Sequence, residues 1–83
     1  MIMADVKVRL FGVYRMDTHI SQTQLSAEKL TDLFTKLNVL TENRSSIDFK
    51  DATVFINGEL CKKRHKKLTD GDEIWLLSPA SGG

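Results

Sequence analysis

The chain has 83 residues, of which 41% are hydrophobic and 28% charged, with a formal net charge of +1. This composition is ordinary for one small globular domain in water, and no apolar run approaches the ~20 residues that span a bilayer. The start, MIMADVKVRL, lacks the apolar stretch and cleavage site of a signal peptide. A single cysteine, Cys61, excludes an internal disulfide. We therefore expect a cytoplasmic protein without a membrane segment.

The first expected element is a strand, because apolar and charged residues alternate over residues 6–10 (VKVRL). Phe11 continues this alternation on the outer face, with the charged residues. Gly12 then opens an expected turn region, GVYRMD, which leads to a polar second strand over about residues 19–25.

A helix is expected next. Ser26 is suited to its N-cap, since a serine hydroxyl accepts hydrogen bonds from first-turn amides, and Glu28 would then lie in that turn, where the helix dipole favours a negative charge. Apolar residues follow at helical spacing and are interpreted as core: Ala27, Leu30, Leu33, Phe34 and Leu37. Asn38 is the expected end of this helix.

Residues 41–51 (TENRSSIDFKD) predict a polar connector, and residues 53–57 (TVFIN) favour a strand. Asn57-Gly58 is a strong signal for a tight turn, because both residues tolerate positive φ. Leu60 resumes an extended segment. A turn over residues 69–72 (TDGD) then leads to a last strand over residues 73–77 (EIWLL).

This last strand is apolar on both faces. Since one helix covers only one face of a sheet, we expect Trp75 and Leu77 on the open face, together with Phe11. Adjacent exposed apolar groups are typical of interaction surfaces. The alternative is that long lysine and arginine side chains fold over them.

The charge is distributed unevenly. Five basic residues surround His65 and are called the basic segment below: Lys62, Lys63, Arg64, Lys66 and Lys67. The remaining seven basic residues face eleven acidic ones, a net charge of −4. The basic segment is interpreted as a solvated loop or as an electrostatic docking surface for an acidic partner. Nucleic-acid binding is not expected, because no aromatic residue interleaves the segment.

The order strand, strand, helix, strand, strand (ββαββ) indicates an α+β fold, a mixed sheet with one main helix packed on one face. We expect residues 1–78 to form this domain and residues 79–83 (PASGG) to form a flexible tail that ends in Gly82-Gly83.

Three features together resemble the ubiquitin-like, β-grasp sulfur carriers: the ββαββ order, the turn and strand LTDGDEIWLL, and the tail SPASGG. Within this group the chain is most similar to the small subunit of molybdopterin synthase, and more distantly to the thiamine-biosynthesis sulfur carrier. The resemblance covers nearly the whole chain. It is specific at residues 68–83 and at VFINGEL, and loose over residues 12–24 and 41–51.

The resemblance implies a carrier that is not catalytic alone and binds no cofactor. The carboxylate of Gly83 would be adenylated by a ubiquitin-activating-type enzyme that uses ATP, and then converted to a thiocarboxylate. The tail would thread into the large subunit of molybdopterin synthase and pass sulfur to a precursor of the molybdenum or tungsten cofactor. It would do so through Pro79, Ala80, Ser81, Gly82 and Gly83. By matching positions, Phe11, Leu60 and Leu77 would line the apolar patch that docks on the activating enzyme.

The tail suits this chemistry. Gly82 and Gly83 lack Cβ and so fit narrow channels, while Pro79 stiffens the exit from the sheet by fixing φ. Other interpretations stay open: a ubiquitin-like modifier joined to lysines through Gly83, a sulfur carrier for another pathway such as thiamine, or a non-covalent binding module. Cys61 and His65 lie four residues apart, but two ligands without a second pair make a weak metal site, so no metal is expected.

Overall fold

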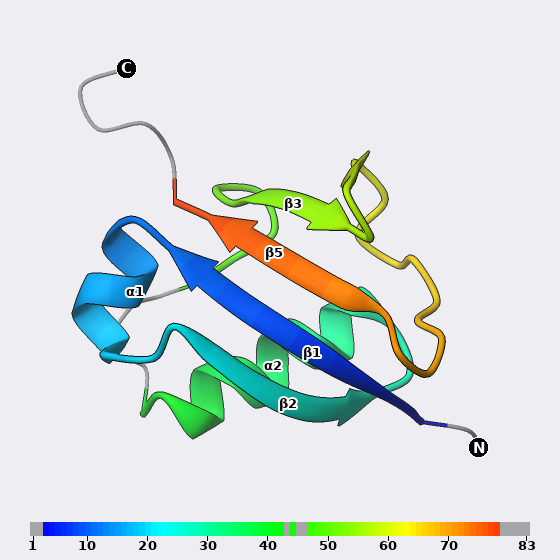
Figure 1. Cartoon of the computed structure of the whole chain (residues 1–83), viewed down its shortest axis with the longest axis horizontal. Helices are drawn as coiled ribbons and strands as arrows, with labels where there is room; N and C mark the ends of the chain where they lie inside the picture. Colours follow the sequence, from blue (N-terminus) through cyan, green and yellow to red (C-terminus); the bar gives the residue numbers. More distant parts are fainter. Residues whose placement is uncertain (1–2, 43, 45–46, 79–83) are drawn as a thin grey trace.

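A five-stranded mixed sheet organises the chain in a computed structural model that describes residues 3–42, 44 and 47–78. The strands lie in the order β2-β1-β5-β3-β4. Strands β1 and β5 run parallel at the centre, and the other neighbouring pairs are antiparallel (Figure 1). The elements are β1 (Ala4–Phe11), α1 (Val13–Thr18), β2 (Gln22–Ala27), α2 (Leu30–Leu40), β3 (Thr53–Ile56), β4 (Glu59–Cys61) and β5 (Glu73–Leu77).

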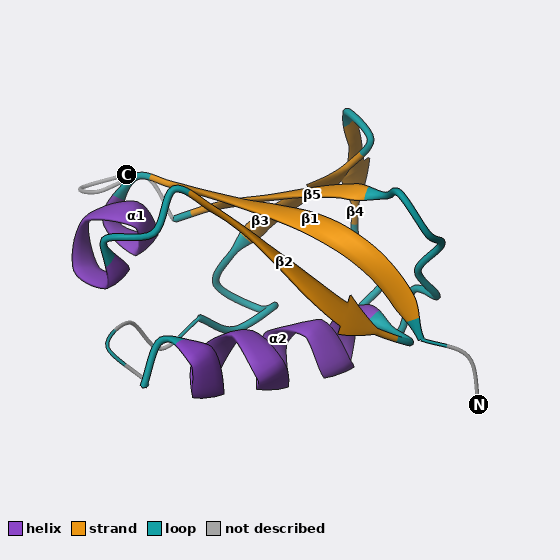
Figure 2. Ribbon diagram, turned by 60° about the horizontal axis from the view of Figure 1, so that its bottom comes forward, coloured by secondary structure: helices purple, strands orange, loops and turns teal. Residues whose placement is uncertain are grey.

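Helix α2 packs against one face of this sheet, and among the described residues no helix covers the opposite face (Figure 2). All five residues of the predicted helical stripe are buried, but Ala27 belongs to β2, and α2 carries the other four: Leu30, Leu33, Phe34 and Leu37. The sheet contributes every second residue of β1, β3 and β5 to the same core: Val6, Val8, Leu10, Val54, Ile56, Ile74 and Leu76. Each large side chain buried in this way stabilises the fold by roughly 1.5–3 kcal/mol. The predicted α+β class, with one main helix on one face, is confirmed, while the predicted order ββαββ lacks the short helix α1 and one of the three strands that follow α2.

The predicted turn region GVYRMD is wrong, because these residues begin helix α1. Tyr14 and Thr18 lie four residues apart, and both are buried. Two backbone conformations with positive φ bound the helix, at Gly12 before it and at His19 after it. The added helix reaches across the end of β1 and brings Tyr14 into the core.

The expected N-cap at Ser26 is also wrong. Strand β2 extends to Ala27, which pairs with Ala4, and the Ser26 hydroxyl donates a hydrogen bond to the Asp5 carboxylate. Helix α2 begins at Leu30, and the Leu30 amide donates to the Lys66 carbonyl at 2.9 Å. A backbone carbonyl from a distant loop therefore satisfies the first amide of α2, which has no side-chain cap.

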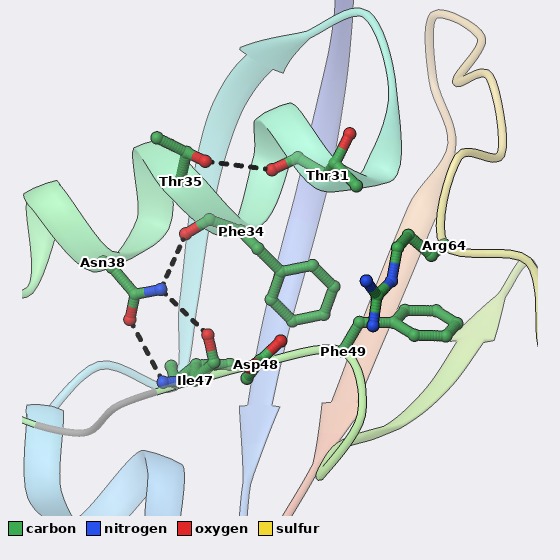
Figure 3. Close-up of a pocket in the computed structure, with 8 residues that line it drawn as sticks. All are labelled: Thr31, Phe34, Thr35, Asn38, Ile47, Asp48, Phe49 and Arg64. Atoms are coloured by element: carbon green, nitrogen blue, oxygen red, sulfur yellow. Dashed lines mark hydrogen bonds between the residues drawn. The ribbon is translucent and has the colours of Figure 1, made fainter.

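Asn38 does not end helix α2, which continues to Leu40. Its side-chain amide donates to the carbonyls of Phe34 at 3.0 Å and Ile47 at 2.8 Å. Its side-chain oxygen accepts from the Ile47 amide at 3.1 Å (Figure 3). These bonds hold Ile47 in the core, where it is 2% exposed. The polar connector thus contributes a buried residue that its composition did not predict.

The predicted tight turn at Asn57-Gly58 is confirmed, since both residues have positive φ, 53° and 86°. The Asn57 side chain donates to the Asp72 carboxylate at 2.9 Å and accepts from the Glu73 amide at 3.0 Å. Asp72 also accepts from the Thr69 amide at 2.8 Å. The turn between β3 and β4 is therefore tied to the turn that starts β5.

No helix among the described residues is long and apolar enough to cross a membrane.

Candidate docking face and tail exit

The uncovered face of the sheet carries a group of apolar side chains. The register places Arg9 beside Trp75, Trp75 beside Phe55, and Phe55 beside Leu60. In the next row, Phe11 lies beside Leu77. The open-face patch consists of Phe11, Phe55, Leu60, Trp75 and Leu77. The alternation argument therefore placed three of its members on the correct face, and the residue implied by the resemblance, Leu60, lies on that face too.

Arg9 covers part of this patch. Its guanidinium carbon lies 5.7 Å from the centroid of the Phe11 ring and 6.0 Å from that of Trp75. Its guanidinium also lies 3.7 Å from the Glu73 carboxylate, which accepts a hydrogen bond from the Trp75 indole at 3.0 Å. The interpretation that an arginine folds over the aromatic residues is thus correct for two of them. Leu60, at the far end of the patch, stays 51% exposed.

Phe55 is the member of the patch that the sequence analysis missed. Its neighbours in β3, Val54 and Ile56, are buried, while Phe55 is half-buried on the other face. The alternation that located Phe11 applies equally to TVFI, so the sequence did contain a usable signal. Phe55 joins Trp75 to Leu60 and makes the patch continuous across four strands, β1, β5, β3 and β4.

The structure also defines where the tail leaves the sheet. Strands β1 and β5 end next to each other, with α1 beside them (Figure 1). Ser78 follows β5, and its hydroxyl accepts a hydrogen bond from the Val13 amide at 3.0 Å. Since Gly12 supplies no side-chain cap to α1, Ser78 caps this helix from 65 residues away. The predicted tail, residues 79–83, lies outside the described residues.

Gly12 makes this contact possible. A Cβ atom at this position would lie 2.3 Å from the Ser78 hydroxyl oxygen. The backbone of Gly12 has φ 64° and ψ −136°. Residues that carry a Cβ rarely adopt this backbone conformation. The start of the tail is therefore held to α1 by a contact that requires glycine.

All five residues of the basic segment are exposed, and they follow β4 directly. The backbone of the segment is held near the start of α2 by two contacts. The Leu68 amide donates to the Glu28 carbonyl, and the backbones of Lys29 and Lys67 form an isolated antiparallel β-bridge. The predicted loop is therefore present, and its backbone is fixed rather than free.

A hollow with a volume of about 380 Å³ lies between α2 and the segment that follows it (Figure 3). Arg64 extends beside the Phe49 ring there, 5.9 Å from its centroid, and Phe34 meets Phe49 edge to face at 6.1 Å. The lining contains no cysteine, histidine or lysine: Thr31, Phe34, Thr35, Asn38, Ile47, Asp48, Phe49 and Arg64. These groups offer packing and hydrogen bonds, and the Thr35 hydroxyl donates to the Thr31 carbonyl and not to a base.

The described residues contain no group of three metal-ligating side chains. Cys61 belongs to β4 and is a free thiol, whereas His65 lies in the turn of the basic segment. Burial, with a smaller contribution from the charges of Asp51 and Asp48, raises the pKa of Tyr14 above its ordinary value of 10.0. A phenol of this kind stays protonated at neutral pH and supplies no base.

Comparison with known proteins shows which family and which solved structures this architecture matches. The family model described as the ThiS family matches residues 8–83. The solution structure of small archaeal modifier protein 1 from Methanosarcina acetivorans is similar, with a TM-score of 0.83 and 29% identity over 100% of both chains. No curated protein matches the sequence.

Two further structures carry the comparison. One is the protein–protein complex of subunits 1 and 2 of the molybdopterin-converting factor from Helicobacter pylori. Its matching chain has a TM-score of 0.66 and 26% identity, covering 95% of this chain and 99% of that chain. The other is Urm1 from Trypanosoma brucei, with a TM-score of 0.60 and 17% identity, covering 98% of this chain and 97% of that chain.

The fold is therefore that of a ubiquitin-like β-grasp protein, as the sequence predicted. The chain belongs to the ThiS family, and its predicted resemblance to the ubiquitin-like sulfur carriers is confirmed.

Proposed function

We propose that the protein is a sulfur carrier in which Gly83 is the carboxyl terminus and the reacting residue. A partner enzyme of the ubiquitin-activating type joins this carboxylate to AMP at the expense of ATP and releases pyrophosphate. Hydrosulfide then attacks the acyl carbon, AMP leaves with the electron pair of the broken C–O bond, and the carboxyl group becomes a thiocarboxylate. The carrier donates this sulfur as the small subunit of molybdopterin synthase, in molybdenum or tungsten cofactor biosynthesis in the cytoplasm.

The observation that supports this proposal most directly is the family match, which extends over residues 8–83 and so includes Gly82-Gly83. The similarity to one chain of the complex of subunits 1 and 2 of the molybdopterin-converting factor supports a large subunit as partner. The carrier binds no cofactor in this proposal, because the activating enzyme supplies the ATP site and the large subunit supplies the acceptor.

In this proposal each part of the chain has a role. Leu77 belongs to the open-face patch and precedes Ser78 directly, so a partner docked on the patch lies close to the start of the tail. The Ser78–Val13 hydrogen bond fixes that start relative to the patch. Pro79, Ala80, Ser81 and Gly82 then carry the carboxylate of Gly83 into the active site of the partner. The tail reaches two successive partners without any catalytic side chain on the carrier.

A second candidate is a protein modifier, which the 29% identity to a small archaeal modifier protein favours. A modifier uses the same adenylate but forms an isopeptide bond with a lysine amine. The two functions differ in their product, since the carrier ends as a free carboxylate after each cycle and the modifier becomes covalently attached. A sulfur carrier for thiamine biosynthesis differs from our proposal only in the acceptor.

Deleting Gly82 and Gly83 tests the proposal. With the activating enzyme and ATP, the full chain should release pyrophosphate, form the thiocarboxylate and support sulfur transfer to the large subunit, whereas the shortened chain should do none of these. Its melting temperature should stay nearly unchanged, because exposed termini carry few contacts. Sulfur transfer by the shortened chain would contradict the proposal. Lysine-linked conjugates of the full chain, formed in place of sulfur transfer, would support the function as a protein modifier.

A further inference from the structure

A groove runs along the exposed edge of the sheet, beside β4. Its volume of about 580 Å³ lies within the ~300–1,000 Å³ typical of ligand sites. Four lysines of the basic segment line it, together with two acidic residues and several apolar and neutral polar side chains. The full lining is Ile56, Asn57, Glu59, Leu60, Cys61, Lys62, Lys63, Lys66, Lys67, Thr69 and Asp72. We call this hollow the basic groove.

The backbone of the basic groove is fixed in place. The Leu30 amide donates to the Lys66 carbonyl at 2.9 Å, and the Lys66 amide donates to the Lys63 carbonyl at 3.2 Å. The Cys61 thiol lies 3.5 Å from the same Lys63 carbonyl. The lysines are thus presented from a held backbone, which lowers the ordering entropy that a ligand must overcome.

The positive charge of the basic groove is incompletely balanced. Across residues 3–42, 44 and 47–78, the ion pairs are Arg9–Glu73 and Arg44–Glu42, and neither involves the basic segment. The lining also holds two carboxylates, Glu59 and Asp72, so its four ammonium groups leave a formal charge of +2 in the groove. Four neighbouring ammonium groups therefore repel one another, and an anionic ligand would relieve this repulsion.

The groove is continuous with the open-face patch, because Leu60 belongs to both. Leu60 is 51% exposed and points to the same face as Phe55. A protein that covers the patch would therefore place its neighbouring residues beside the lysines. An apolar residue with acidic neighbours matches this combination of one exposed leucine and four cations.

We propose that the basic groove binds an acidic peptide segment of a protein partner, with an apolar side chain of that segment against Leu60. A nucleic acid fits less well, because no aromatic side chain among the described residues lines the groove for stacking. Outside the basic segment the chain also has a net charge of −4, which repels a polyanion that extends beyond the groove. The inference does not depend on the chemistry at Gly83.

An NMR titration of the full chain tests this inference at ~0.15 M salt, where distant charges are screened. The probe is an end-blocked synthetic peptide, Glu-Glu-Leu-Glu-Glu. Amide shifts should change at residues 59–69 and little elsewhere. In the variant Lys62→Glu/Lys66→Glu, affinity should fall about tenfold, because each exposed ion pair changes affinity by roughly two- to fivefold. The control Arg15→Glu/Lys50→Glu makes the same change of charge at exposed positions outside the groove and should lose less than about threefold.

A second comparison isolates the apolar contact. Replacing the leucine of the peptide by serine should weaken binding to the unchanged protein but not to Leu60→Ser, since the two changes remove the same contact. Absence of binding, shifts centred outside the groove, or equal losses in the two charge variants would each overturn the inference. Tighter binding of an oligothymidylate of equal charge would also overturn it and assign the groove to nucleic acid.

Discussion

Replacing Gly12 with alanine should destabilise the protein through the contact that holds the start of the tail. The backbone of Gly12 has φ 64° and ψ −136°, and holding such a conformation with a Cβ costs ~1–3 kcal/mol. The new Cβ would lie 2.3 Å from the Ser78 hydroxyl oxygen, so this side chain must rotate away. It then loses its 3.0 Å hydrogen bond with the Val13 amide, which is worth ~0.5–1.5 kcal/mol.

The two effects together lower the free energy of unfolding by about 1.5–4.5 kcal/mol. For a domain of this size each kcal/mol shifts the melting temperature by roughly 4–8 °C, so we expect a fall of at least ~6 °C. The fluorescence of Trp75, which is the single tryptophan, reports thermal and urea unfolding.

Ser78→Ala supplies the control. It removes the hydrogen bond and leaves the backbone of Gly12 unstrained, so it should cost only about 1 kcal/mol. The double variant should be as stable as Gly12→Ala alone, because both changes remove the same bond. Additive losses, or a loss for Gly12→Ala no larger than that for Ser78→Ala, would refute this reasoning.

Three further predictions follow from other contacts. The raised pKa of Tyr14 means that the unfolded chain loses this proton first, so the free energy of unfolding should fall as pH rises above ~10. Urea unfolding measured from about pH 8 to about pH 11.5 should show a smaller fall in the free energy of unfolding for Tyr14→Phe than for the unchanged protein. Asn38→Ala should cost ~2–3 kcal/mol in the same assay at neutral pH, because it leaves the backbone of buried Ile47 without partners. Leu60→Ser should weaken binding to the activating enzyme by about tenfold, as for the loss of one interface anchor. Leu40→Ser changes a leucine of similar exposure, 46% against 51%, and should leave binding unchanged. Equal binding of the two leucine variants would show that the open-face patch is not the docking surface.

Local patterns in the sequence located the sheet and its faces. Alternation in β1 assigned Phe11 to the open face, and the apolar strand β5 assigned Trp75 and Leu77 to the same face, as the register shows. The face of a strand residue can be assigned from the sequence alone, because successive side chains of a strand point to opposite faces of the sheet. The same rule would have identified Phe55.

Contacts between distant segments explain what the sequence did not predict. The start of α2 depends on the Lys66 carbonyl and not on Ser26. The start of α1 depends on Ser78, which lies at the other end of the chain. The sequence predicts a helix end at Asn38, but its side chain forms hydrogen bonds with the backbone of Ile47 in the polar connector. A capping residue is recognisable from sequence only when its partner is local, and in these three cases the partner is not.

The intact mass of the protein from cells that contain its activating enzyme tests the central claim most directly. The account predicts a fraction of the chain in which one oxygen is exchanged for sulfur, with the change mapped to the peptide that ends in Gly83. It also predicts that this species disappears when the large subunit and its pterin substrate are added. An unmodified mass under these conditions, or one accompanied only by lysine-linked conjugates, would contradict the assignment as a sulfur carrier.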